Sequence, residues 1–258
     1  MKHLAKTLVL ITIFIVNLGG STQAASTYIP PNAIPLLPEV RTAILDLEVE
    51  FCYDLMAASI EQESCLSLTH SKCWSTESQL LTYWNKAKGI RREQGIGLGQ
   101  FTRAWRSNGD LRFDTLSELA RTYPKQLAGF NWSTARSSPL LQIKAMALLM
   151  NETHGKLPKE ASMEARDAMT ISAYNAGKKR LAEDRRTCQI KQACDPNQWW
   201  GNVETIKAPG FATEPLYGWA SAWDLNRHHV KKVMKERRPK YTDWFKDREP
   251  NPIPSCLN

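Results

Sequence analysis

Two glutamates, Glu61 and Glu63, lie near the end of an amphipathic pattern that begins at Pro38. Apolar and small residues recur there at steps of three and four, which predicts a helix over residues 38–62. The helix dipole disfavours an anion at the C-terminal end of a helix, and burial favours the acid form of a carboxyl group further. A glutamic acid in such a place can donate a proton near neutral pH. The alternative interpretation is a solvated glutamate at a helix end.

A glycine-rich stretch further along the chain is suited to binding a polar ligand. Gly95, Gly97 and Gly99 occupy every second position and are followed by Gln100. Glycines allow a ligand to approach the main chain closely, and the Gln100 amide offers both a donor and an acceptor to sugar hydroxyls or an N-acetyl group. A glycine-rich turn before a helix explains the same pattern.

A third stretch places a phenol and an amide at a predicted helix end. Residues 161–176 are expected to form a helix that ends at Tyr174 and Asn175, because Gly177 follows and glycine commonly ends helices. Both side chains would then lie at one edge of the protein. The alternative is a buried tyrosine followed by a C-terminal asparagine.

The elements that must position these residues are all predicted to be helices, so the expected fold class is all-α. Residues 139–152 are apolar nearly all round and are expected to form the buried central helix. Asp114 and Ser138 are suited to begin the helices that follow them. The remaining predicted helices span residues 77–88, 101–107, 115–123, 178–186 and 215–237.

The N-terminus has the layout of an export signal. A short basic segment precedes an apolar run over residues 7–18, and small residues follow it up to Ala24 and Ala25. The run is shorter than the roughly 20 residues that span a bilayer. We therefore expect cleavage after residue 24 or 25 and a periplasmic or secreted location, with no stable membrane insertion afterwards. An uncleaved anchor is the alternative.

The charge of the chain favours an anionic partner. The formal net charge is +8, and loss of Lys2 and Lys6 with the signal lowers it to +6. The positive residues are spread along the sequence, and no pattern typical of a nucleic-acid-binding module is visible. For an exported protein, a cell-wall glycan with peptide carboxylates is favoured over nucleic acid.

An even number of cysteines in an exported chain indicates disulfides. Six cysteines allow 15 pairings; short separations suggest Cys65–Cys73 and Cys188–Cys194, which leaves Cys52–Cys256. A metal site is the competing interpretation, but no Cys-x-x-Cys pair occurs. His228 and His229 are adjacent, so on a helix they point to different faces and do not easily share one ion.

The three stretches together resemble the soluble lytic transglycosylase family, which has a goose-type lysozyme-like helical fold and cleaves peptidoglycan. That family carries a Glu-Ser pair, then a Gly-Leu-Met-Gln loop, then an Ala-Tyr-Asn-Ala-Gly helix end. The matching residues here are Glu63-Ser64, Gly97 to Gln100 and Ala173 to Gly177, in the same order. The resemblance covers about residues 40–185.

The resemblance implies a reaction and roles for five residues. The β-1,4 bond between N-acetylmuramic acid and N-acetylglucosamine would be cleaved with formation of a 1,6-anhydromuramoyl end. Glu63 would act first as general acid and then as general base. Tyr174 would orient Glu63, Asn175 would support the site, and Ser64 and Gln100 would line the cleft. No metal or organic cofactor is required.

The N-terminal patterns and the resemblance together suggest a domain organisation. We expect a signal peptide over residues 1–24, a Pro-rich linker over 25–37, a catalytic domain over 38–208, and a helical extension over 209–258 packed on the core. The chain departs from the family in having Gly99 where the family has methionine, and in matching no part of it after about residue 190. The tryptophans and other aromatic residues from 199 to 223 either extend the glycan cleft or pack the extension onto the core.

Three alternatives concern the chemistry. Glu61 is a rival for the catalytic acid, but it lies about 200° round a helix from Glu63, so both cannot face one cleft. The Glu-Ser match favours Glu63. A hydrolase on the same fold would need a second carboxylate, for which Glu93 and Asp110 are available. A non-catalytic wall-binding or assembly protein, working with a secretion, conjugation or phage apparatus, is the third hypothesis.

Overall fold

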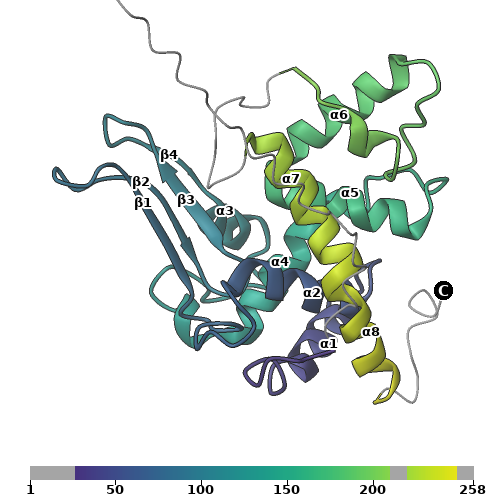
Figure 1. Ribbon diagram of the computed structural model, residues 1–258. Coiled ribbons are helices and arrows are strands. Elements are labelled where there is room, and N and C mark those ends of the chain that lie inside the picture. The colour runs from purple at the N-terminus through teal and green to yellow at the C-terminus, as the bar shows by residue number, and fades with distance from the viewer. Residues whose placement is uncertain (1–26, 210–219, 249–258) are drawn as a thin grey trace, which may run out of the picture.

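The computed structural model describes residues 27–209 and 220–248 and shows a mixed α/β fold, so the expected all-α class is wrong (Figure 1). Four antiparallel strands in the order β1-β2-β3-β4 form a sheet that projects from one side of a body of helices. The strands are β1 (Gln79–Asn85), β2 (Ile90–Ile96), β3 (Phe101–Trp105) and β4 (Leu111–Asp114).

The two helices predicted over residues 77–88 and 101–107 are strands β1 and β3. Strand β1 is exposed or half-buried at every position, so it lacks the alternation that marks a strand with one buried face. Its Thr82-Tyr83-Trp84 segment has high strand propensity. Gly89, with φ +67°, allows the tight turn that pairs β1 with β2.

The helices of the described residues form a body to one side of the sheet (Figure 1). They are α1 (Leu37–Asp46), α2 (Tyr53–Ser64), α3 (Thr115–Thr122), α4 (Pro139–His154), α5 (Met163–Ala176), α6 (Lys178–Ile190), α7 (Ala222–Lys231) and α8 (Arg238–Lys246). Helix α3 packs against β3. A π-helical turn, η3 (Lys232–Arg237), joins α7 to α8, and short 3-10 turns occupy Ala135–Ser137 and Val203–Thr205.

The single helix predicted over residues 38–62 is two helices, α1 and α2. The chain leaves the helical conformation at Glu48, whose φ is +50°, and re-enters it after Cys52, which is extended. The intervening Phe51 is buried in the core, and this burial explains why the chain turns inward here. Helix α2 is buried at each residue from Tyr53 to Glu61, so it shares with α4 the central place expected for residues 139–152.

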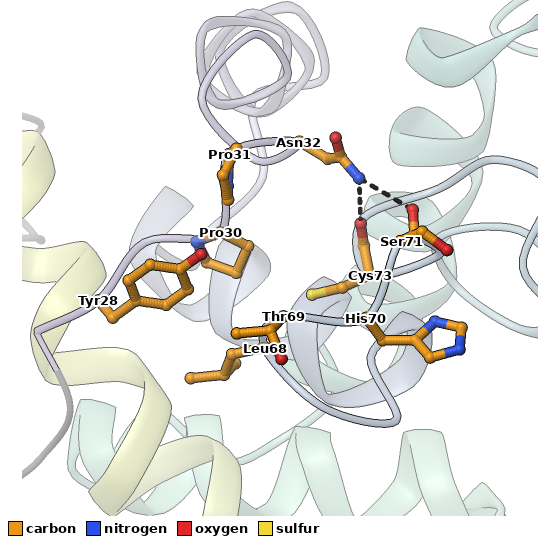
Figure 2. A pocket seen from close by; sticks show the side chains of 9 residues that line it. All are labelled: Tyr28, Pro30, Pro31, Asn32, Leu68, Thr69, His70, Ser71 and Cys73. Carbon is orange, nitrogen blue, oxygen red and sulfur yellow. Dashed lines mark hydrogen bonds between the residues drawn. The ribbon is translucent and has the colours of Figure 1, made fainter.

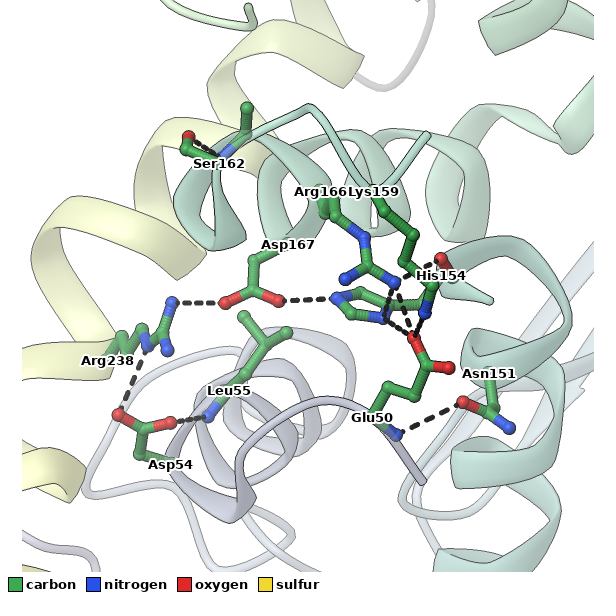
Figure 3. A network of polar contacts seen from close by, with 11 residues as sticks. Glu50, Asp54, Leu55, Asn151, His154, Lys159, Ser162, Arg166, Asp167 and Arg238 are labelled. Atoms are coloured by element: carbon green, nitrogen blue, oxygen red, sulfur yellow. Dashed lines mark hydrogen bonds and ion pairs between the residues drawn. The ribbon is translucent and has the colours of Figure 1, made fainter. Parts of the chain in front are cut away.

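Buried ion pairs hold the C-terminal helices against the rest of the body. Arg238 contacts Asp54 at the start of α2 at 3.1 Å and Asp167 of α5 at 2.8 Å. Asp167 in turn lies 3.1 Å from the His154 ring at the end of α4 (Figure 3). Buried charges are tolerated only when they are paired. This network therefore fastens α8 to α2, α4 and α5 at one place.

Two of the three expected disulfides are confirmed. The disulfides Cys65–Cys73 and Cys188–Cys194 are both present. Cys256 and the apolar run near the N-terminus lie outside the described residues. Within residues 27–209 and 220–248, no helix has both the length and the apolar composition needed to cross a bilayer.

Candidate functional site

Glu63 lies in the last turn of α2, where its side chain is 16% exposed. Burial raises the pKa of this carboxyl from 4.5 to about 8. Taking a carboxylate out of water disfavours its charged form, and the surroundings of Glu63 supply no cation to offset that cost. The side chain is therefore protonated at neutral pH and still reaches solvent.

Glu61 is two residues away and has a different environment. Its carboxylate is fully buried and contacts Arg237 Nη1 at 2.6 Å, Lys240 Nζ at 2.7 Å and Tyr241 Oη at 2.6 Å. Two cations and a hydroxyl donor compensate its negative charge inside the protein. Glu61 therefore joins α2 to η3 and α8 and has no open side from which a substrate could approach.

The glycine-rich stretch is a turn between β2 and β3, held from below by Gln142 of α4. The Leu98 amide donates to Gln142 Oε1 at 2.6 Å, and Gln142 Nε2 donates to the Ala135 carbonyl at 2.7 Å. Gly97 has φ +79°, and a Cβ there would lie 2.1 Å from Gln142 Oε1. Glycine at position 97 is thus required both by backbone conformation and by the close approach of Gln142.

Tyr174 at the end of α5 holds the same turn from the other side. Its hydroxyl donates to the Gly99 carbonyl at 2.5 Å, and a Cβ at Gly99 would lie 2.8 Å from that hydroxyl. Burial and the charge of Glu63 raise the pKa of Tyr174 well above its ordinary value, which places the phenol within electrostatic reach of Glu63. Tyr174 therefore links the glycine turn to the vicinity of Glu63.

Gln100 completes the turn in the left-handed region, with φ +46°. Its Nε2 donates to the Gly97 carbonyl at 2.8 Å and to Ser78 Oγ at 3.3 Å. Its Oε1 lies over Gly95, because a Cβ at that glycine would be 2.8 Å from the oxygen. The amide is half-buried and oriented by the turn, on the face of β2 to which Gly95 belongs.

Ser64 supports the helix end from inside. Its hydroxyl donates to the Ile60 carbonyl at 2.7 Å and accepts from the Trp74 amide at 3.2 Å, and the residue is 3% exposed. The structure therefore places Ser64 beneath the site, where it connects α2 to the loop closed by the Cys65–Cys73 disulfide. It does not place the hydroxyl on an open surface.

Asn175 reaches the site through His229 of α7. Asn175 Nδ2 lies 3.3 Å from His229 Nδ1, and His229 Nε2 lies 3.4 Å from Glu63 Oε1. Burial, together with the positive charges of Arg237 and His228, lowers the pKa of His229 from 6.5 to about 3. The imidazole is therefore neutral at physiological pH, and it does not hold Glu63 in the ionised form.

His229 and Gln142 were missed as site residues by sequence reasoning. The sequence led us to weigh His229 only as a metal ligand beside His228, and residues beyond 190 resembled no part of the family. One usable signal was the spacing of Asn226 and His229, which lie three residues apart on one helix face. Gln142 had the signal of a polar residue within an otherwise apolar helix.

The tryptophans at 199 and 200 pack the C-terminal part of the chain. Trp199 is buried beneath the Arg227 guanidinium, whose carbon lies 4.9 Å from the ring centroid. Trp200 Nε1 donates to Glu164 of α5 at 3.0 Å. These contacts favour packing over an extension of the cleft for this pair.

A cavity of about 200 Å³ lies between the N-terminal arm and the loop that follows α2 (Figure 2). Asn32 spans it by donating to the carbonyls of Ser71 and Cys73 at 3.1 and 3.0 Å. None of the candidate site residues lines this cavity. It is therefore separate from the site around Glu63.

The chain matches no protein-family model, and no curated protein sequence is significantly similar to it.

Proposed function

We propose that this protein is an exported lytic transglycosylase that cleaves peptidoglycan glycan strands. The observation that carries the proposal is the setting of Glu63, whose carboxyl has a pKa of about 8 because of burial alone. The acid lies at the end of α2 within electrostatic reach of Tyr174, which holds the glycine turn. These are the three motifs on which the resemblance rests, brought to one region of the fold.

The proposed mechanism uses one residue twice. Glu63 protonates the oxygen between N-acetylmuramic acid and N-acetylglucosamine, the bond from that oxygen to C1 breaks, and an oxocarbenium-like centre forms, stabilised by the 2-acetamido group. The Glu63 carboxylate then removes the proton from the 6-hydroxyl, and O6 bonds to C1 to close the 1,6-anhydro ring. A pKa near the working pH suits both steps, because it balances proton donation against proton removal.

A hydrolase is the second candidate function. It would need a second carboxylate, and the position of Glu93 favours this residue over Asp110. Glu93 lies two residues before Gly95 on β2, so both residues share the face over which the Gln100 oxygen lies. Asp110, the other acid considered, is in the exposed turn between β3 and β4, where its amide is bonded to Asn108. Glu93 is therefore the residue to test for a second carboxylate role.

Export is part of the proposal and is supported by two features. The disulfides Cys65–Cys73 and Cys188–Cys194 are typical of an oxidising compartment. The formal net charge, +8 for the full chain and +6 after loss of the expected signal, suits a wall polymer that carries carboxylates. The periplasm or the exterior of the cell is the compartment in which both features would operate.

The test is mass spectrometry of the muropeptides that the oxidised protein releases from purified sacculi, with the Glu63→Gln protein as negative control. We expect products that lack one water and end in 1,6-anhydromuramoyl groups. Reducing ends that disappear in Glu93→Gln would instead establish the hydrolase. No release by a folded, oxidised protein would overturn both enzymatic proposals and favour a wall-binding protein.

A further inference from the structure

The orientation of the Asn226 amide is determined by two partners of unambiguous chemistry. Arg227 Nη1 donates to Asn226 Oδ1 at 2.7 Å, and Asn226 Nδ2 donates to the Ser172 carbonyl at 3.0 Å. A guanidinium has only donors and a carbonyl has only acceptors. The Asn226 amide therefore cannot be reversed, and its nitrogen must be the atom that also faces Asn175.

That nitrogen determines the next amide and then the imidazole. Asn226 Nδ2 donates to Asn175 Oδ1 at 3.0 Å, which leaves Asn175 Nδ2 as the atom 3.3 Å from His229 Nδ1. An N–H group directed at Nδ1 requires a lone pair there. A neutral imidazole carries one proton, so that proton is on Nε2, the nitrogen that faces Glu63 Oε1 at 3.4 Å.

We propose that His229 is a positioning residue that presents an Nε2–H donor to Glu63, and that Arg227, Asn226 and Asn175 determine its tautomer. The inference rests on the proposed function for its catalytic meaning and assigns the C-terminal helix α7 a part in the site. The chain of donors runs in one direction, from the guanidinium through two amides to the imidazole. Each member is oriented by the one before it.

The arrangement suits a residue that must lose a proton and regain it. A histidine cation at this place would stabilise the Glu63 carboxylate before any substrate bound. It would therefore lower the fraction of Glu63 that is protonated. A neutral N–H group adds no charge, and at 3.4 Å from Glu63 Oε1 it is close enough to form a hydrogen bond with a small shift once Glu63 becomes an anion. The contact therefore favours the intermediate in which Glu63 has given its proton away.

The other titratable and charged groups near the pair come from three elements. Tyr174 of α5 interacts with the Glu63 charge, while His228 of α7 and Arg237 of η3 act on His229. Arg237 is itself bonded to Glu61 and Gln62 on the adjoining face of α2. Any pH dependence assigned to His229 must be compared with the effects of these neighbours. Tyr174 stays neutral at pH 7, because its pKa is raised above the ordinary value.

The first experiment measures the tautomer and needs no substrate. Two-bond ¹H–¹⁵N spectra of the histidine-labelled protein are expected to show His229 as the neutral Nε2–H form at pH 7, with the signal assigned by its loss in His229→Gln. Asn175→Asp cannot donate to Nδ1, so it should move a proton onto Nδ1. Asn85→Asp, which adds the same charge at the exposed end of β1, should leave the spectrum unchanged. A protonated Nδ1 in the parent protein would overturn the proposal, whatever the protein cleaves.

The second experiment measures kcat on sacculi against pH. Glutamine can place an N–H where Nε2 lies, so His229→Gln should stay within about 3-fold of the parent, whereas His229→Leu should lose about 10- to 100-fold. Removing a donor from the carboxylate should also move the alkaline limb of the His229→Leu profile to higher pH. Equal losses in both variants with an unmoved limb would show a purely structural role. If sacculi are not cleaved at all, the proposed function fails, and the tautomer measurement still decides this inference.

Discussion

Glu61 and Glu63 lie on opposite sides of the same turn of α2, and their side chains have opposite electrostatic environments. Glu61 is surrounded by Arg237, Lys240 and Tyr241, all within 2.7 Å. Glu63 has a neutral imidazole at 3.4 Å and no cation that affects its pKa. Both carboxyl groups are largely removed from water, so burial by itself does not distinguish them.

The difference shows that the partners supplied by the C-terminal segment determine what each acid can do. Cations from η3 and α8 pair with the Glu61 carboxylate in a buried cluster that joins elements of the fold. His229 from α7 leaves Glu63 as an uncharged acid whose proton is available. An uncharged carboxyl group and a structural ion-pair cluster thus lie on one helix turn, and residues of the same C-terminal segment contact both.

The largest expected effect is on activity, from Glu63→Gln. Removing the proposed acid and base should lower kcat on sacculi by about 10²- to 10⁴-fold, while the midpoint of thermal unfolding stays within about 2 °C of the parent or rises. Glu160→Gln, at an exposed position before α5, is the matched control and should retain full activity. Parent-level cleavage by Glu63→Gln would remove this residue from the mechanism.

The second effect is on stability, from Glu61→Gln. The substitution leaves the buried Lys240 ammonium without its counter-ion, so the free energy of unfolding should fall by about 3–5 kcal/mol in urea denaturation. Glu164→Gln removes an ion pair with Lys235 in which both side chains are about half exposed, and it should cost less than about 1 kcal/mol. Equal costs for the two variants would contradict the contrast between a buried cluster and a surface pair.

The third effect is the pH dependence that Glu63 adds to stability. Its pKa rises from 4.5 to about 8 on folding, so its contribution is fully present below pH 4.5 and is lost as the pH rises through 8. Glu63→Gln lacks this linkage and should gain stability relative to the parent between pH 5 and pH 9, by up to about 1.4 kcal/mol for each pKa unit. Urea denaturation at pH 5, 7 and 9 measures the difference. Cleavage by the parent should decline as the pH rises through about 8. If the stabilities of the parent and of Glu63→Gln changed in parallel with pH, that result would contradict the raised pKa.

The smallest effect concerns the glycine turn between β2 and β3, which Tyr174 connects to the vicinity of Glu63. A Cβ at Gly99 would lie 2.8 Å from the Tyr174 hydroxyl, so Gly99→Ala should cost about 1–3 kcal/mol and lower activity. Tyr174→Phe removes the crowded oxygen, so the double variant should recover part of the loss. Simple additivity of the two substitutions in urea denaturation would show that this close approach is not the cause.

Residues close together in the sequence determined the ends of several elements. Asp114 begins α3 by accepting from the Ser117 amide, Pro139 begins α4, and Gly177 follows the last residue of α5. Capping and proline geometry act within one helical turn, so they can be recognised without knowledge of the fold. The two local disulfides follow from the same closeness in sequence.

Only the tertiary structure decided the sheet and the environments of the two glutamates. Strand β1 is exposed or half-buried at every position, so no hydrophobic period distinguished it from a helix. Its backbone hydrogen bonds are made with β2, which only the fold brings beside it. His229 reaches Glu63, and Lys240 reaches Glu61, from a part of the chain far along the sequence. The protonation of a buried carboxyl depends on which charges fold against it, and such contacts leave no local pattern in the sequence.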